Sequence, residues 1–434
     1  MLNLEHAWML NGTVAKLQDP YDIFKHARKY RPRKHSALIN THLLDECLYD
    51  AHHCPSNKKE DFSHCCSQET KQQQEPCLFF VFNSFLYDTL NLEPHQVMKG
   101  QQQDCFGGGQ ITLLDHGVLR YRPKQHLNAN YVVISAGIHG DETAPLEIMD
   151  TMVADILSGS WLPTQHILFI IANPKAIKKH QRFVDENLNR LFDKKVIVAD
   201  NIEGQIARRL KHHMKDFYQP SSDMSSRWHF DLHCSMRHSK HYIFAVSPKV
   251  NHPVRSRALI DMLQAGGVSA LMLSTKSSST FSWFSAERFG AQAVTVELGR
   301  VNRLQHNDLH RLEPFTQALR ASLAGRPYPQ PCLASQSCTG MVIYRVNRTI
   351  TRTHHNFTFN FASDIPNFSP FMYGVKLGMN GDESLYALCD HESIVFPNPN
   401  VGLGRRAAVM VVEVPAHFEN QQLVVIERER ERIP

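Results

Sequence analysis

Short apolar segments, separated by polar stretches, run through the chain from about residue 77 onwards. Those with the length and composition of buried strands are 131–135, 166–171, 227–232, 242–246, 270–273 and 293–298. Residues 145–157 and 202–217 instead repeat apolar positions at the spacing of an α-helix, and Pro145 suits a first helical turn. Strands that alternate with helices, several of them wholly apolar, predict an α/β domain around a largely parallel sheet.

The pattern changes after about residue 332. Short alternating segments recur at 341–345, 357–361, 375–377, 393–396 and 409–414, and the Asn-Gly pair at 380–381 is a strong hairpin signal. This texture predicts a small β-rich domain. We therefore expect an α/β domain over residues 77–331, a β-rich domain over 332–418 and a charged, solvated tail over 419–434.

Residues 1–76 have a different character, because they are polar, rich in His and Cys, and show little apolar periodicity. The interpretation that we favour is a poorly ordered N-terminal extension. The alternative is a small metal-binding module built from the cysteines and histidines between Cys47 and Cys77. The spacing of these residues lacks the paired Cys-x-x-Cys knuckles of a zinc ribbon, which weighs against that alternative.

The composition of the 434 residues, with 42% hydrophobic and 21% charged side chains, is that of a soluble globular protein. A formal net charge of +5 is small for this length and predicts neither a nucleic-acid nor a membrane partner. No run approaches the ~18 apolar residues of a spanning helix. The first residues lack the pattern of a secretory signal, so we expect the ten cysteines to be free thiols in the cytoplasm. The oligomeric state stays open.

A candidate metal site follows the first predicted strand. The sequence Gly-Ile-His-Gly-Asp-Glu at 137–142 places His139 three residues before Glu142, so one helical turn would bring both side chains to one face. His233 comes directly after the third predicted strand, and the carboxyl ends of strands form sites in open α/β sheets. Two histidines and one carboxylate suit a catalytic zinc ion, because they leave a fourth position open for water.

Glu297 closes the last predicted strand, where a carboxylate is costly to bury without a partner. We interpret it as the group that handles the proton, and the alternative is a buried ion pair with a nearby arginine. With 26 histidines in the chain, the spacing of His139 and Glu142 alone is close to chance. The metal hypothesis therefore depends on His233 and Glu297 as well. Asp231 suits either a partner of His233 or a purely structural role.

A basic, amide-containing segment lies between these groups, over residues 178–190. Arg182 and Arg190 flank a loop that contains Asn187 and Asn189. Guanidinium groups match carboxylates with two parallel hydrogen bonds, so an anionic substrate beside the metal would need such side chains. By itself, a segment of this kind is more often a solvated surface loop.

Together these motifs resemble the succinylglutamate desuccinylase/aspartoacylase family, and its desuccinylase branch most. The similarity lies in Gly-Ile-His-Gly-Asp-Glu-Thr-Ala-Pro at 137–145, Asn-Leu-Asn-Arg at 187–190, Asp-Leu-His at 231–233 and Val-Glu-Leu-Gly at 296–299. Further matches at 284–286, 289–291, 362–364 and 396–399 extend it over about residues 78–415.

The resemblance implies a zinc-carboxypeptidase-like α/β/α layered domain with a mixed sheet, followed by a small β-rich domain. It implies one zinc ion on His139, Glu142 and His233, with Glu297 as base and acid. The implied reaction is hydrolysis of N-succinyl-L-glutamate, a small acidic N-acyl-amino acid, to succinate and L-glutamate. That reaction is the last step of the succinyltransferase route of arginine degradation.

The resemblance also implies roles in substrate binding for residues of the basic segment. Arg182 would polarise the substrate carbonyl, while Asn189 and Arg190 would hold a substrate carboxylate. Two positions depart from the family pattern. Asn187 stands where an aspartate is usual, and an amide there would orient a neighbouring arginine without supplying charge. Cys234 stands where a threonine usually follows the histidine.

Two other functions stay open at this point. One is an aspartoacylase or another N-acyl-amino-acid deacylase, because the pocket residues that set substrate length cannot be located in the sequence. The other is a zinc-binding protein without catalysis, for which Asn187 is the only hint.

Overall fold

The computed structural model describes residues 84–125, 128–193, 200–328 and 340–426. The predictions for residues 1–76, for a domain boundary near residue 331 and for the part of the charged tail from 427 onwards lie outside these ranges. Residues 419–426 lie inside them, and there the predicted solvated tail is wrong, because residues 422–425 pair with 416–419 as an antiparallel strand and Leu423 is buried. Within the described ranges, no helix combines the length and the apolar character needed to span a membrane.

The described elements are given in chain order, first the helices and then the strands. The α-helices are α2 (Phe85–Asn91), α3 (Ala144–Ser158), α4 (Pro174–Lys178), α5 (Ile202–Tyr218), α6 (Arg257–Ala265), α7 (Phe281–Phe289) and α8 (Glu313–Leu323). The first strands are β1 (Gln102–Asp104), β2 (Gln110–Asp115), β3 (Val118–Arg122), β4 (Tyr131–Ala136), β5 (His166–Ile171), β6 (Arg227–Ser235), β7 (Ile243–Ser247), β8 (Ala270–Leu273) and β9 (Gln292–Arg300). The later strands are β10 (Val342–Thr351), β11 (Phe357–Phe359), β12 (Ser369–Phe371), β13 (Lys376–Asn380), β14 (Glu383–Tyr386), β15 (Glu392–Val395), β16 (Arg406–Glu413), β17 (Ala416–Glu419) and β18 (Gln422–Val425).

Most of these strands join one sheet of 13 strands, in the order β1-β2-β3-β5-β4-β6-β9-β7-β8-β10-β16-β15-β12. Strands β5, β4, β6 and β9 are parallel at its centre, and β3 and β7 flank them in the antiparallel direction. The mixed sheet implied by the family resemblance is therefore confirmed. The largely parallel sheet predicted from the alternation of strands and helices holds for two blocks, β5-β4-β6-β9 and β7-β8-β10. The antiparallel pairing of β7 with β9 and hairpins such as β2–β3 interrupt the parallel order elsewhere.

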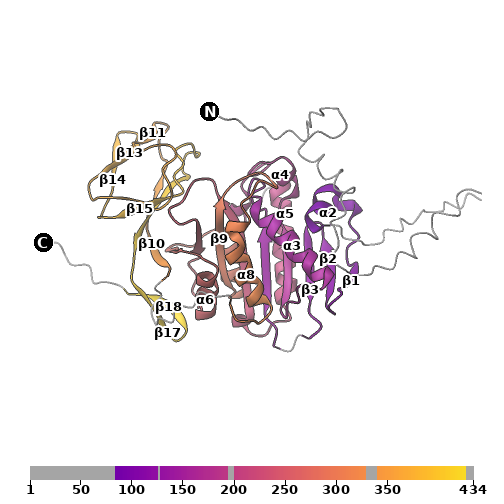
Figure 1. Ribbon diagram of the computed structural model, residues 1–434. Helices are drawn as coiled ribbons and strands as arrows, with labels where there is room; N and C mark the ends of the chain where they lie inside the picture. The colour runs from indigo at the N-terminus through magenta and orange to yellow at the C-terminus, as the bar shows by residue number, and fades with distance from the viewer. Residues whose placement is uncertain (1–83, 126–127, 194–199, 329–339, 427–434) are drawn as a thin grey trace, which may run out of the picture. The chain divides into compact units, whose positions relative to one another are not determined.

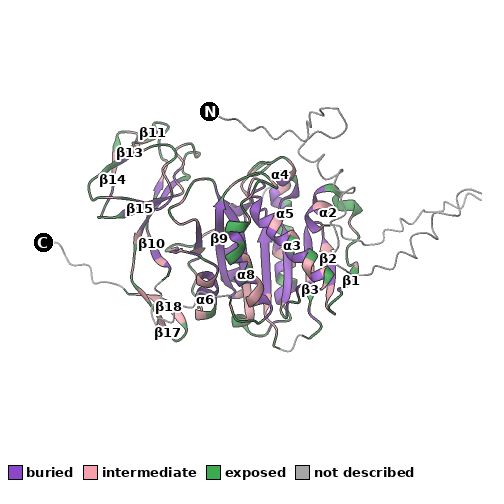
Figure 2. Cartoon of the chain, in the orientation of Figure 1, coloured by how far each residue is buried: buried purple, intermediate pink, exposed green. Residues whose placement is uncertain are grey.

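Helices cover both faces of this sheet (Figure 1). Helices α5 and α7 pack on one face, where Leu210 and Phe284 share an apolar cluster with Val133 of β4. Helices α3 and α8 lie side by side on the other face, joined by an ion pair of 2.6 Å between Asp155 and Arg320. The central strands are almost wholly buried between these layers, as Figure 2 shows. The α/β/α layering is confirmed.

Four of the C-terminal strands, β10, β16, β15 and β12, continue the same sheet. Strand β10 runs parallel to β8 and pairs with β16 in the antiparallel direction. Beyond it, β11, β13 and β14 form a small sheet, in which the predicted hairpin joins β13 to β14 and Gly381 has a φ of +66°. The β-rich character of this region is confirmed. Because β10 and β16 are hydrogen-bonded into the main sheet, their side chains can reach the edge where the central strands end.

Two central strands are longer than predicted. Strand β6 continues to Ser235, so His233 lies within it and not directly after its end. Strand β9 continues to Arg300, so Glu297 lies further inside the strand than predicted. The ladder continues because β6 pairs with β4 on one side and with β9 on the other. In this register His233 stands opposite Glu297. Alternate residues share a face, so Asp231 points the same way as His233.

Candidate metal centre and its cavity

The turn after β4 depends on two glycines. Gly137 has a φ of +69°, and a Cβ at Gly140 would lie 2.2 Å from the backbone carbonyl carbon of Ala176. Only glycine meets both requirements without strain. The backbone N–H of Glu142 donates to the carbonyl of His139 at 3.3 Å, so the chain makes the predicted turn there.

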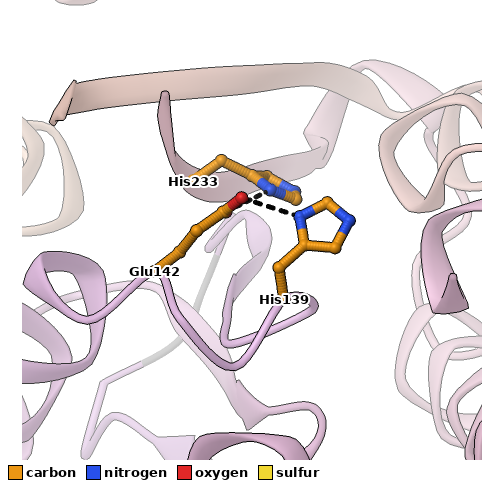
Figure 3. A group of neighbouring side chains, drawn as sticks. All are labelled: His139, Glu142 and His233. Carbon is orange, nitrogen blue, oxygen red and sulfur yellow. Dashed lines mark hydrogen bonds and ion pairs between the residues drawn. The ribbon is translucent and has the colours of Figure 1, made fainter. Parts of the chain in front are cut away.

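His139, Glu142 and His233 meet in a buried cluster, which we call the trio (Figure 3). The Glu142 carboxylate lies between the two imidazole rings. Its Oε1 is 2.8 Å from His139 Nδ1, and its Oε2 is 2.7 Å from His233 Nδ1. One donor atom from each residue lies within 4.8 Å of the others. The structure thus brings together all three residues predicted to hold the metal.

The opposite ring nitrogens have partners of their own. His233 Nε2 lies 3.1 Å from Asp231 Oδ2, and His139 Nε2 lies 3.2 Å from Asn187 Oδ1. Oxygen acceptors on the far side of an imidazole fix its tautomer and its orientation. Both rings therefore present Nδ1 to the centre of the trio.

The electrostatics of the trio reflect three buried groups in contact. Burial lowers the pKa of His139 to about 4, against the opposing effect of Glu142, so this ring is neutral. Burial disfavours charge on Glu142 and His233 too, but their mutual attraction reverses the outcome. The pKa of Glu142 is held well below its usual range, and Asp231 and Glu142 hold that of His233 well above.

A zinc ion fits this donor set. Two imidazole nitrogens and one carboxylate are common zinc donors, and both rings have the orienting partners that such ligands use. A cation would replace the proton that the two carboxylates otherwise favour on His233. A second sign is Glu297 Oε2, which is buried and has no hydrogen-bond partner in the described part of the chain. A water molecule beside the metal would satisfy that oxygen.

Glu297 lies next to the trio on β9 and is only 8% exposed. Burial, and then the charge of Glu142, raises its pKa to about 7. A carboxyl group with this pKa is matched to proton transfer near neutral pH. The buried ion pair that the sequence left as an alternative does not occur among the described arginines, since Arg182 pairs with Glu142 instead.

A chain of buried hydrogen bonds extends behind the trio. Asp231 Oδ1 accepts from Ser135 Oγ at 2.6 Å, and the same hydroxyl lies 2.8 Å from His229 Nε2. His229 Nδ1 in turn lies 2.7 Å from Ser285 Oγ of α7. Asp231 therefore links His233 to β4 and to a covering helix. Sequence reasoning missed Ser135, His229 and Ser285, although the His-x-Asp-x-His alternation at 229–233 was a usable signal.

The basic segment reaches the same site and is not a solvated surface loop. Arg182 Nη1 donates to Glu142 Oε1 at 2.9 Å. The side-chain oxygen of the buried Asn189 accepts from the backbone N–H of Phe281 at 2.8 Å, which leaves its amide nitrogen as a donor. Arg190 Nη1 donates to the carbonyl of Asn189 at 2.8 Å. All three predicted substrate residues line one cavity with the trio.

That cavity has a volume of about 1290 Å³. The C-terminal strands and the loops before them supply a substantial part of its lining, which the sequence could not identify. These residues include Arg348, Asn367, Phe396, Asn398, Arg405 and Arg406. Asn367 also ties the two regions together, because its amide donates to Ser235 Oγ at 2.9 Å, at the end of β6.

Comparison with known proteins identifies the family. The catalytic-domain model of the succinylglutamate desuccinylases and aspartoacylases matches residues 128–323, and the barrel-sandwich hybrid domain model of the same proteins matches residues 339–414. The succinylglutamate desuccinylase of Vibrio campbellii is 46% identical over 345 residues, which cover 79% of this chain and 97% of that protein. The chain belongs to the succinylglutamate desuccinylase/aspartoacylase family.

Solved structures of this family agree. The succinylglutamate desuccinylase of Vibrio parahaemolyticus superposes with a TM-score of 0.74 at 46% identity, covering 79% of this chain and 99% of that chain. That of Vibrio cholerae gives a TM-score of 0.75 at 45% identity, covering 79% and 98%. The resemblance inferred from the motifs is confirmed, and so is the zinc-carboxypeptidase-like fold.

One expectation drawn from the family pattern is wrong. We expected the side chain at position 187 to orient a neighbouring arginine. Asn187 instead begins the short 3-10 turn Leu188–Arg190, so its side chain folds back over the turn. Its oxygen accepts from the backbone N–H of Asn189 at 3.0 Å and faces His139. The amide that replaces the usual family aspartate therefore acts on a member of the trio.

The second departure has a milder consequence. Cys234 directs its side chain away from the trio, where Sγ lies 3.5 Å from the carbonyl oxygen of Leu298. Only its backbone N–H contacts the trio, at 3.2 Å from Glu142 Oε2. Any residue with a backbone N–H can make that contact.

Proposed function

We propose that this protein is a zinc-dependent hydrolase that converts N-succinyl-L-glutamate and water into succinate and L-glutamate. Family membership supports the substrate, since relatives named succinylglutamate desuccinylase are 46% identical and are matched over 97% of their length. The observation that carries the proposal is Glu297, a buried carboxyl group with its pKa raised to about 7, opposite His233 on the neighbouring strand. A protein that only stored zinc would not need such a group.

In this proposal His139, Glu142 and His233 hold one zinc ion. When bound there, zinc supplies Lewis acidity, which makes water more acidic and a carbonyl carbon more electrophilic. Asp231 and Asn187 hold the two imidazoles in place through Nε2. The three proposed ligands and the two side chains that orient them are all buried or half-buried, so their orientation is set before substrate arrives.

Glu297 is the proposed proton carrier. It takes a proton from the attacking water as the new C–O bond forms, and Oε2, which has no other partner among the described residues, can receive it. It then delivers that proton to the amide nitrogen as the C–N bond breaks, because an amide leaves only as a protonated amine.

The basic segment is proposed to bind the rest of the substrate. The Arg182 N–H groups not used by Glu142 can donate to the carbonyl oxygen as negative charge develops on it. The amide nitrogen of Asn189 and the guanidinium of Arg190 can hold a carboxylate.

The proposed place of this reaction is the last step of the succinyltransferase route of arginine degradation, in the cytoplasm. The cysteines within the described ranges, Cys105, Cys234 and Cys389, are all free thiols. Free thiols agree with a reducing compartment.

The test uses full-length protein loaded with stoichiometric zinc. Release of the amino acid is measured in parallel from N-succinyl-L-glutamate, N-acetyl-L-glutamate and N-acetyl-L-aspartate. We expect preferred cleavage of the succinyl compound, abolished by a chelator and restored by zinc. Preference for N-acetyl-L-aspartate would make the protein an aspartoacylase. No cleavage of any of them, with zinc bound, would refute hydrolysis of this substrate class.

A further inference from the structure

The C-terminal strands add guanidinium groups to the cavity that holds the trio. Arg406, the first residue of β16, and Arg405 just before it line the cavity together with Arg182 and Arg190 of the basic segment. Arg182 pairs with Glu142. In the described part of the chain, no carboxylate forms an ion pair with any of the other three. Arg190, Arg405 and Arg406 thus bring positive charge to the cavity without an ion-pair partner among the described residues.

Arg348 shows that this is not a property of every arginine in the cavity. Its Nη2 lies 2.8 Å from Glu392 Oε2, and its Nε lies 3.0 Å from Oε1 of the same carboxylate. This buried carboxylate occupies the Nε–Nη2 edge of the guanidinium, so Arg348 has a structural explanation. Arg406 has only the ring of Phe396, with its guanidinium carbon 5.7 Å from the ring centroid. Its N–H donors meet no acceptor among the described residues.

The uncompensated arginines repel one another. Burial, and then the charges of Arg406, Arg182 and Arg405, lowers the pKa of Arg190 to about 9. Arg182 repels Arg406 as well, although the charge of Glu297 acts in the opposite direction. Arg406 still exposes much of its surface, because it borders the open cavity. An anion that enters between these groups relieves the repulsion.

We propose that Arg406 binds a second substrate carboxylate, next to the one held by Arg190 and Asn189. This inference rests on the proposed function and deepens it, because N-succinyl-L-glutamate carries one carboxylate on the acyl chain and two on glutamate. The planar fork of an arginine matches a carboxylate with two parallel hydrogen bonds. Arg405 adds longer-range attraction at the edge of the cavity. The C-terminal region is thus part of the substrate site and not only a structural appendage.

The experiment compares Arg406→Gln with wild type on three substrates of nearly equal shape. They are N-succinyl-L-glutamate, N-butanoyl-L-glutamate, which lacks the acyl carboxylate, and N-succinyl-L-norvaline, which lacks the side-chain carboxylate. We expect kcat/KM for the parent substrate to fall about 10- to 100-fold, the range for a lost charge-assisted contact. The loss should shrink to within about 3-fold on one truncated substrate only, because that substrate has no carboxylate for Arg406 to hold.

Two further variants keep the result interpretable. Lys376→Gln removes a positive charge from an exposed position of β13 outside the cavity, and it should leave kcat/KM unchanged. Arg406→Lys keeps the charge but not the fork, and it should retain part of the activity. Zinc content and circular dichroism confirm that each variant is folded. An equal loss on all three substrates, with a shifted pH profile, would mean that Arg406 acts through Glu297 and would overturn the proposal.

A binding measurement separates this inference from the proposed function. Zinc-loaded full-length protein is titrated calorimetrically with glutarate, a dicarboxylate, and with butanoate, a monocarboxylate. We expect wild type to bind glutarate at least about 10-fold more tightly, and Arg406→Gln to lose that advantage. Equal glutarate binding by both proteins overturns the second subsite whether or not any amide is cleaved. Glutarate binding that depends on Arg406, without cleavage, rejects the proposed reaction and retains the subsite.

Discussion

Charged side chains on the two sides of the cavity differ in whether they have protein partners. The strand side is formed by β4, β6 and β9, and the C-terminal side is formed by the start of β16. On the strand side, Asp231 contacts both Ser135 and His233. On the C-terminal side, Arg405 and Arg406 face the cavity without a carboxylate partner in the described chain. The difference indicates that the chemical groups are arranged in advance, whereas the charge of the recognition surface is balanced only when an anion binds.

Burial explains why the two sides differ. The central strands lie between two helical layers, where bulk water reaches few polar groups, so most of these groups have a protein partner. Arg405 and Arg406 are exposed, so water solvates their charges until a substrate displaces it. Breaking a contact on the strand side should therefore cost metal, catalysis or stability, and breaking one on the C-terminal side should cost substrate affinity.

The largest expected effect comes from removing a member of the trio. His233→Ala should reduce bound zinc from one ion per chain to a small fraction and abolish hydrolysis, because the site loses a donor and Glu142 and Asp231 each lose a buried partner. Metal analysis after dialysis measures the loss. His212→Ala, at an exposed position of α5, is the matched control and should keep its zinc. Retention of stoichiometric zinc by His233→Ala would remove His233 from the site.

Glu297→Gln should separate chemistry from metal binding. We expect kcat to fall about 10³-fold or more, because the proton carrier is lost, while zinc content and substrate affinity stay close to wild type. Single-turnover kinetics with parallel metal analysis provides the measurement. A variant that turns over normally would refute the role of Glu297.

The pH dependence of the reaction tests the same residue without a mutation. Since the pKa of Glu297 is raised to about 7, its carboxylate form is lost as the pH falls through that value. We therefore expect kcat/KM to fall on the acid side, by about 100-fold over two pH units. Zinc adds a nearby positive charge, which moves this limb to lower pH. An acid limb that persists unchanged in Glu297→Gln would contradict Glu297 as the base.

Ser135→Ala probes the buried hydrogen-bond chain. It removes the hydroxyl that joins Asp231 to His229, and two buried polar atoms lose a partner. We expect a loss of about 1–3 kcal/mol in the free energy of unfolding, measured by urea denaturation. Ser158→Ala, at an exposed position near the end of α3, should change it far less. Equal stability of the two variants would mean that the chain contributes nothing.

The sequence predicted the central strands and the trio because both have local signals. Apolar runs such as 131–135 and 166–171 correspond closely to β4 and β5, and the Gly-rich turn set the direction of His139 and Glu142. The part that was missed depends on contacts between distant segments. No sequence pattern near Arg406 predicts that β10 extends the main sheet and that its pairing with β16 places Arg406 at the cavity.

Asn187 shows the same limit at a single residue. Its position two residues before Asn189 was evident, but the direction of its side chain depends on a one-turn 3-10 helix that has no apolar periodicity. We therefore assigned its contact to the wrong neighbour. The structure gives a more specific hypothesis, in which the side chain at position 187 acts on His139 through its Nε2.

The smallest expected effect comes from Asn187→Asp. A carboxylate beside His139 Nε2 makes the imidazole a stronger donor, so we expect zinc to bind up to about 10-fold more tightly, measured by competition with a chelator. The added negative charge also lies near Arg190 on the cavity wall, so KM should rise slightly while kcat is maintained. Asn187→Ala, which removes the acceptor, should weaken zinc binding instead. Equal zinc affinity in all three proteins would show that this contact leaves the metal centre unaffected, and the aspartate usual in the family would then need another explanation.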